Sequence, residues 1–168
     1  MEAPARQLTV GDLNGLDADG CAAALAPLFE RAPRFLARLC EARPFADDAA
    51  LFARARRIAR ALPEDEQVEL INAHPRLGAP PAAVSALSYA EQGYDRDTTA
   101  AIEELGTLNE AYERRFGFRY CTFVAGRSRP ALLPEFRERL QAGRDAELAR
   151  ALEAVVDIAE DRFRKARA

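Results

Sequence analysis

Apolar residues recur every three to four positions along most of the chain, which is the period of an amphipathic helix. Between residues 17 and 32, for example, Leu25, Leu28 and Phe29 fall on one helical face. The same spacing continues, with interruptions, to the last ten residues. The pattern predicts helices over residues 17–32, 33–42, 46–62, 63–74, 96–117, 130–141 and 145–165.

Proline and glycine mark the predicted ends of these helices. Pro33 suits the first turn of a helix, where its missing N–H is not needed. Pro75 disfavours the helical conformation of the residue before it, so the fourth helix should end at His74. Gly117 is a plausible C-cap for the long helix, and prolines and glycines make residues 75–95 irregular.

One run, "FRYCTFVAG" at residues 118–126, has the composition of a strand. It has no partner strand in the sequence, so it cannot build a sheet by itself. A buried extended segment of this kind can offer its backbone amides to a ligand. We therefore predict an all-α fold: one compact bundle of about seven or eight helices, forming a single domain over residues 1–168.

The composition is that of an ordinary globular protein and argues against nucleic-acid binding. Of the 168 residues, 49% are apolar and 30% are charged, the net charge is −3 and the pI is about 5.4. The arginine-rich stretch "ARARRIAR" at residues 53–60 has acidic surroundings that weaken long-range attraction to phosphates. We expect a solvated helix face there, and no nucleic-acid partner.

No stretch approaches the ~20 consecutive apolar residues of a membrane span, and no signal pattern opens the chain. We therefore expect no membrane partner and a cytoplasmic location. Cys21, Cys40 and Cys121 are widely spaced, as expected of buried thiols in a reducing compartment. With only one histidine in the chain, they do not form a zinc-binding pattern, so we expect no metal.

That single histidine, His74, is the first candidate for chemistry. It lies at a predicted helix C-terminus, which stabilises an imidazolium, and Pro75 fixes the backbone that follows. An imidazole held in this way can act as a general acid or base near neutral pH. The alternative is a structural histidine whose ring satisfies a nearby carbonyl.

Arg162 interrupts the apolar stripe of the last helix. Leu148, Leu152, Val155 and Ala159 form that stripe, and Arg162 continues it toward the core. An inward guanidinium can bind a planar anion such as a carboxylate in bidentate fashion. The alternative, which geometry alone leaves equally open, is a side chain that snorkels past the edge of the core.

The stretch "SYAEQ", residues 88–92, also has two interpretations. Ser88 and Glu91 have the spacing of a capping box, in which each side chain satisfies the other's exposed amide. Gly93 follows directly, so any helix that begins here is short. Glu91 and Gln92 could equally line a pocket.

Taken in order, seven short motifs resemble the OHCU decarboxylase family, whose substrate is 2-oxo-4-hydroxy-4-carboxy-5-ureidoimidazoline. They are "LFERAP", "RPF", "HPRLG", "SxxEQ", "LNEAYERRFGF", "AGR" and "IAEDRF", spread over about 130 residues. No single motif is specific, but their order and spacing are. The resemblance implies an all-helical, cofactor-free decarboxylase of the route from urate to allantoin, acting on a small molecule and usually a homodimer.

The resemblance also implies a set of site residues. His74 and Glu91 would be catalytic, with His74 matching the family's histidine in the histidine-proline pair. The substrate-binding residues would be Pro75, Ser88, Gln92, Phe116, Cys121 and Arg162. Gly117 matches the glycine after the family's phenylalanine, and at Cys121 it is the backbone that would face the ligand.

The chain departs from the family pattern at several positions. Arg76 and Gly78 stand where "HPDLA" is frequent, "GYD" follows the glutamate-glutamine, and Arg119 and Tyr120 replace a frequent proline and phenylalanine. These departures leave open two further hypotheses. One is a decarboxylase of a related ureido or imidazoline acid, and the other is a catalytically silent helical ligand-binding module.

Overall fold

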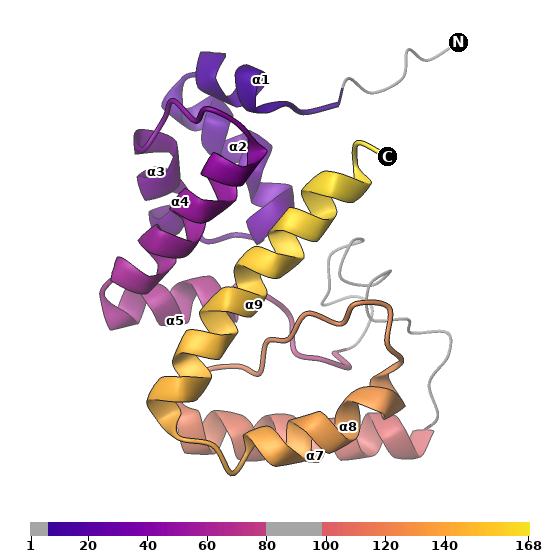
Figure 1. Ribbon diagram of the computed structural model, residues 1–168. Coiled ribbons are helices and arrows are strands. Elements are labelled where there is room, and N and C mark those ends of the chain that lie inside the picture. The colour runs from indigo at the N-terminus through magenta and orange to yellow at the C-terminus, as the bar shows by residue number, and fades with distance from the viewer. Residues whose placement is uncertain (1–6, 80–98) are drawn as a thin grey trace. The chain divides into compact units, whose positions relative to one another are not determined.

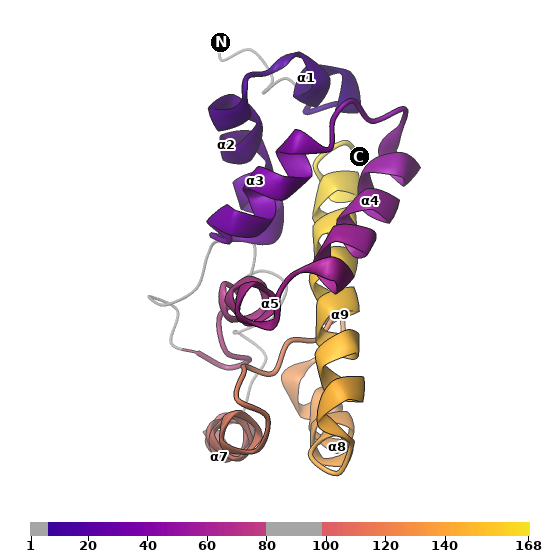
Figure 2. The same ribbon diagram turned by 90° about the vertical axis from the view of Figure 1, so that its left-hand side faces the viewer.

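The computed structural model describes residues 7–79 and 99–168 (Figure 1; Figure 2). Within these ranges the chain forms eight helices and no strand, so the predicted all-α class is confirmed. Two compact units can be distinguished. The first contains the described residues up to Leu70 together with Val156–Ala168, and the second is Ile71–Val155.

The first unit is built around α2 and α3. Its helices are α1 (Val10–Gly15), α2 (Ala18–Phe29), α3 (Pro33–Glu41), α4 (Asp48–Ala61), most of α5 (Glu64–Asn72) and the end of α9 (Arg144–Lys165). Helix α3 packs against both α2 and α4, and α1 packs against α2. Aromatic pairs fill the interior: the rings of Phe29 and Phe35 are 5.0 Å apart, and those of Phe52 and Phe163 are 5.5 Å apart.

The starts of these helices follow from local side-chain chemistry. Asp17 and Asp47 accept hydrogen bonds from the amides of Gly20 and Ala50, each at 2.7 Å, and so cap α2 and α4. Pro33 is the first residue of α3, as predicted. Helix α1 was not predicted, because its six residues are too few to show a period.

The second unit contains α7 (Thr99–Phe116), α8 (Arg129–Arg139) and the first half of α9. Helices α7 and α8 pack against each other. Helix α7 ends as predicted, because Gly117 adopts the left-handed conformation (φ 80°) and its amide donates to the carbonyl of Glu113 at 2.8 Å.

The run from residue 118 to residue 126, whose composition is strand-like, forms neither a strand nor a helix and, as expected, builds no sheet. Its buried apolar residues are Phe118, Tyr120, Cys121 and Val124, and the aromatic ones belong to an aromatic core. Tyr120 stacks on Phe136 with 3.8 Å between ring centroids, and Tyr112 contacts both Phe118 and Tyr120 at 5.9 and 5.2 Å. Strand-like composition here reflects burial of aromatic rings in a helical unit.

Helix α5 ends at Asn72, two residues before the predicted end at His74. The turn that follows is held by a bond from the His74 amide to the carbonyl of Ile71, at 3.2 Å. Arg119, outside the helix, donates a hydrogen bond to the carbonyl of its last residue, Asn72. His74 therefore lies just beyond the helix, in the segment that leads to Gly78.

Candidate functional site

His74 is a buried residue, with 4% of its surface exposed, and it lies in the second unit directly after α5. Pro75, which follows it, is half-buried. His74 lies outside any helix, where side chains are often exposed, yet its imidazole is buried, and burial holds the ring in a defined position. Packing therefore fixes the position of the only histidine in the sequence.

Arg119 binds the backbone on both sides of this turn. Its backbone amide donates to Oδ1 of Asn72 at 2.9 Å. Its Nη1 atom donates to the carbonyl of Asn72 at 2.9 Å and to the carbonyl of His74 at 3.2 Å. One arginine therefore satisfies two carbonyls at the C-terminal end of α5, the end at which a cation is favourable.

The segment after His74 is tied to α7 by three further contacts. Arg76 forms a bidentate ion pair with Glu113, with N–O distances of 2.7 and 2.5 Å, and this hydrogen bonding raises the pKa of Arg76. The side-chain amide of Asn109 donates to the carbonyl of Leu77 at 2.8 Å. Gly78 has φ +82° and approaches the side chain of Leu105.

Phe116 and Gly117 form the end of α7. Phe116 is buried, and its ring lies 4.5 Å from that of Tyr112. Its carbonyl accepts a hydrogen bond from Nε of Arg144 at 3.0 Å. The predicted substrate contact of Phe116 is untested, but the residue is firmly part of the aromatic core of the second unit.

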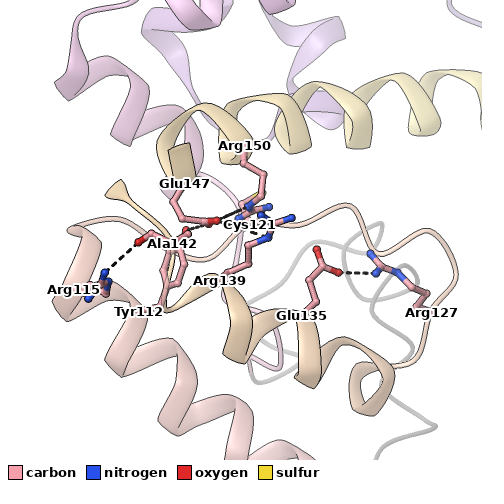
Figure 3. Close-up of polar contacts among 9 residues, drawn as sticks. All are labelled: Tyr112, Arg115, Cys121, Arg127, Glu135, Arg139, Ala142, Glu147 and Arg150. Atoms are coloured by element: carbon pink, nitrogen blue, oxygen red, sulfur yellow. Dashed lines mark hydrogen bonds and ion pairs between the residues drawn. The ribbon is translucent and has the colours of Figure 1, made fainter. Parts of the chain in front are cut away.

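Cys121 has its backbone carbonyl held by an arginine of α9. Nη1 of Arg150 donates to this carbonyl at 3.0 Å (Figure 3). The Arg150 guanidinium also lies 5.2 Å from the centre of the Tyr120 ring. The Cys121 side chain is 4% exposed. The segment whose backbone was expected to face a ligand is thus fixed in part by Arg150.

Glu147 organises this region and was not found by sequence reasoning. Its side chain is 1% exposed and accepts a hydrogen bond from the Tyr112 hydroxyl at 2.7 Å. Nε of Arg150 lies 2.9 Å from it, and Nε of Arg139 lies 3.7 Å from it (Figure 3). A usable signal existed in the sequence, since Glu147 lies four residues before Ala151 on a helix face whose residues are buried.

The charges of this cluster change the acidity of its members. Burial raises the pKa of the Tyr112 hydroxyl far above its usual value, and the hydrogen bond to Glu147 adds to the effect. Burial lowers the pKa of Arg150, but Glu147, Tyr112 and Tyr120 together raise it, so the pKa is raised overall. The phenol therefore stays neutral and the guanidinium charged at any physiological pH.

Arg162 points into the first unit, as its place on the apolar stripe predicted, and its side chain is 2% exposed. The snorkelling alternative is therefore wrong. Its Nη1 atom donates to the carbonyls of Pro27 and Leu28 at 3.1 and 3.2 Å, and its Nη2 lies 3.2 Å from Oε1 of Glu30. The guanidinium thus binds the C-terminal end of α2.

The remaining predicted residues, Ser88, Glu91 and Gln92, lie outside the described residues. Their capping or pocket-lining roles stay predictions. His74, Pro75, Phe116 and Cys121 belong to the second compact unit and Arg162 to the first. The structure therefore brings four predicted residues into one unit, and the shared site with Arg162 stays a prediction.

A hollow of about 460 Å³ lies in the first unit, between the start of α4 and the end of α9. None of the predicted site residues lines it. Arg167, on its wall, pairs with Asp48 and stacks 5.0 Å from the centre of the Phe163 ring. Its charged groups already neutralise one another, so it offers no obvious anion or cation site.

The described residues contain neither a candidate metal cluster nor a candidate membrane-spanning helix. Across residues 7–79 and 99–168, no group of three or more histidine, cysteine, aspartate or glutamate side chains is placed to hold a metal ion. No helix in the same ranges has both the length and the apolar character needed to cross a membrane.

The most informative comparison is with a protein-family model described as OHCU decarboxylase, which matches residues 14–164. The 2-oxo-4-hydroxy-4-carboxy-5-ureidoimidazoline decarboxylase of Haloferax volcanii is 30% identical over 160 residues, covering 94% of this chain and 95% of that protein. The uric acid degradation bifunctional protein PucL of Bacillus subtilis is 32% identical over 161 residues. The match covers 94% of this chain but only 32% of the Bacillus protein.

Two solved structures share the fold. One is described as OHCU decarboxylase in the presence of (S)-allantoin; it superposes with a TM-score of 0.70 at 22% identity, covering 84% of this chain and 95% of that one. The other is (S)-allantoin synthase, with a TM-score of 0.69 at 24% identity, covering 95% of this chain and 54% of that one. With the family match across residues 14–164, these findings establish that the chain belongs to the OHCU decarboxylase family.

Proposed function

We propose that this protein decarboxylates 2-oxo-4-hydroxy-4-carboxy-5-ureidoimidazoline to (S)-allantoin in the breakdown of urate. The observation that carries the proposal is the family match over residues 14–164, a span that contains His74, Glu91 and Arg162. The names of the Haloferax and Bacillus relatives, which refer to this decarboxylation and to uric acid degradation, support it.

The proposed reaction needs positioned acid and base groups. The bond between the ring carbon and its carboxylate breaks, carbon dioxide leaves, and the electron pair moves to the adjacent imine, whose nitrogen takes up a proton. The resulting enol loses its hydroxyl proton while the neighbouring carbon gains one. Net, one proton replaces one carbon dioxide, and delivery of the carbon-bound proton to one face gives one hand of allantoin.

In this proposal His74 polarises or deprotonates the substrate hydroxyl, and Glu91 assists in the proton transfers. Burial of His74 and the hydrogen bond from Arg119 to its backbone carbonyl support a fixed acid-base group.

The remaining predicted residues would hold the substrate. Arg162 would bind its carboxylate or ureido oxygen, while Glu91 and Gln92 would bind the ureido and ring N–H groups and Ser88 would steady them. Pro75, Phe116 and the backbone at Cys121 would form the wall of the pocket. The adjacent imine of the substrate supplies the electron acceptor, so the proposal includes no metal or organic cofactor.

The proposal extends to the state of the protein in the cell. We propose a homodimer in the cytoplasm, with residues 1–168 acting as one domain. The family resemblance supports the dimer, and the cysteine usage of the sequence supports a reducing compartment.

The test follows the circular dichroism of urate freshly converted by urate oxidase and hydroxyisourate hydrolase. Without a decarboxylase the product of those enzymes decays to racemic allantoin, so a strong optical signal requires the activity. Wild-type protein should produce the signal. His74→Ala should lower the rate by about 10²–10⁴-fold, the usual contribution of a positioned acid-base group.

His74→Gln serves as the matched variant, because it retains a polar side chain of similar size but cannot exchange a proton near neutral pH. Both variants should show the far-ultraviolet spectrum of the wild type. A flat optical trace from folded wild type would sink the proposed function. Activity retained in both variants would remove His74 from the mechanism and leave the reaction itself in place.

A further inference from the structure

His74 lies at a point where a chain is ordinarily loose, immediately beyond a helix end. The last carbonyls of a helix lack partners within it, and such ends fray unless something binds them. A ring that takes part in proton transfer must nevertheless be held within a fraction of an ångström. The question is which residue supplies that restraint.

We propose that Arg119 is a positioning residue for His74. Three hydrogen bonds tie it to the turn, two to Asn72 and one to the carbonyl of His74 itself, at 2.9, 2.9 and 3.2 Å. The guanidinium is planar and rigid, so two carbonyls bound through one nitrogen are fixed relative to each other. The turn between Asn72 and His74 is thereby held at both of its ends.

Arg119 can restrain His74 because Arg119 is itself restrained. Its neighbours Phe118 and Tyr120 are each 1% exposed and belong to the aromatic core of the second unit. Arg119, between them, is half-buried and carries its charge to the end of α5. The aromatic core thus fixes the backbone from which the guanidinium reaches the histidine segment.

The inference concerns a feature particular to this chain. Arg119 stands at one of the positions where the sequence departs from the family pattern, so its role does not follow from the resemblance. The proposed role of Arg119 rests on the proposed function only because it takes His74 as the catalytic group. The geometry of the restraint is independent of the reaction.

The experiment compares Arg119→Ala and Arg119→Lys with the wild type. The matched control is Arg43→Ala, because Arg43 is also half-buried and also donates to backbone carbonyls, those of Cys40, Leu13 and Leu16. Arg43 belongs to the first unit, so its loss tests stability without touching the His74 turn. Each protein is measured for kcat, KM and thermal midpoint.

A second readout does not depend on activity. His74 is the only histidine, so the imidazole C–H protons give a single set of proton NMR resonances that reports on this residue alone. If Arg119 positions His74, these resonances should shift or broaden in Arg119→Ala and stay unchanged in Arg43→Ala. Arg119→Lys should lie between, because an ammonium on a flexible stem can bind these carbonyls but lacks the planar, rigid geometry that fixes them relative to each other.

In turnover, Arg119→Ala should lower kcat by about 10–100-fold, the effect of misplacing a catalytic group by about 1 Å, with KM changed less. Arg43→Ala should lose thermal stability and keep its kcat below its melting range. Resonances and kcat that match the wild type in both Arg119 variants would overturn the inference.

The outcomes separate this inference from the proposed function. Shifted histidine resonances in an enzyme that shows no decarboxylation in any form would support the restraint and refute the reaction. An active wild type with an unchanged Arg119→Ala would do the reverse. If Arg119→Ala does not fold, Arg119→Lys carries the same test.

Discussion

Helix α9 carries two arginines that do similar work in the two units. Arg150, in the second unit, binds the carbonyl of Cys121 and the carboxylate of Glu147. Arg162, in the first unit, binds two carbonyls at the end of α2 and the carboxylate of Glu30. Each guanidinium binds both backbone carbonyl and carboxylate oxygens, Arg150 in the irregular segment at Cys121 and Arg162 at the C-terminal end of α2.

The two differ in their counter-ions. The side chain of Glu147 is 1% exposed and is approached by donors from three residues, whereas that of Glu30 is 15% exposed and pairs with Arg162. Removing a partner of a buried carboxylate strongly destabilises the folded state, because it leaves an unpaired charge in the interior. An arginine whose counter-ion reaches solvent is held less tightly. Direction toward the core therefore does not by itself distinguish a structural arginine from a ligand-binding one.

The largest effect should come from Glu147→Ala. Removing one member of a buried ion pair leaves Arg150 without its carboxylate, and we expect a loss of about 3–5 kcal/mol in the free energy of unfolding. Urea denaturation measures this loss. Asp145→Ala, an exposed acid on the same helix, should cost less than about 1 kcal/mol. Equal losses of unfolding free energy in the two variants would contradict the conclusion that burial makes Glu147 more important to stability than an exposed acid.

Arg162→Ala should have a smaller effect on stability, about 2–3 kcal/mol, because water can reach the Glu30 carboxylate that it leaves behind. Arg162→Lys should recover part of that stability, since an ammonium still binds α2 carbonyls. Both the free energy of unfolding and the turnover rate should be measured for each Arg162 variant, so that a structural role can be separated from substrate binding. Loss of turnover in Arg162→Lys at nearly normal stability would make this arginine a substrate ligand as well as a cap for α2.

The smallest effect concerns Tyr120, over whose ring Arg150 lies. Burial raises the pKa of Tyr120 to about 12. A raised pKa of a phenol contributes stability that is present below the ordinary value near 10 and is lost between pH 10 and 12. Between pH 9 and 11 the wild type should therefore lose about 1 kcal/mol more unfolding free energy than Tyr120→Phe. If the unfolding free energies of the two proteins, measured with urea, changed in parallel over this pH range, burial would not be protecting the Tyr120 hydroxyl from ionisation.

Most of the helical framework was predictable because it rests on local rules. Spacing of apolar residues located seven of the eight described helices, and Pro33 and Gly117 marked an actual start and an actual end. Helix α1 was missed although Thr9 and Asp12 form a capping box, because a six-residue helix shows no period. The run after Gly117 builds no sheet, as its lack of a partner strand predicted, and its strand-like composition reflects aromatic residues that suit strands and helical cores alike.

The candidate site was predictable only in part, because partners distant in sequence leave no local signal. The inward direction of Arg162 followed from its stripe, but its contacts at Pro27 and Leu28 are more than 130 residues away. The link between Arg119 and His74 spans 45 residues and has no spacing rule. The catalytic role of His74 and the substrate-binding role of Arg162 came from the family resemblance rather than from local patterns.

Gly78 is a poor position for a substitution meant to raise the thermal stability of this protein. Replacing a glycine by alanine is a common stabilising strategy, because it reduces the conformational freedom of the unfolded chain. At Gly78 the strategy should fail: φ is +82°, and an added Cβ would lie 3.1 Å from Leu105. The new methyl group would press on Leu105 of α7 and strain the short segment that carries both Gly78 and His74, so the substitution should lower both thermal stability and turnover.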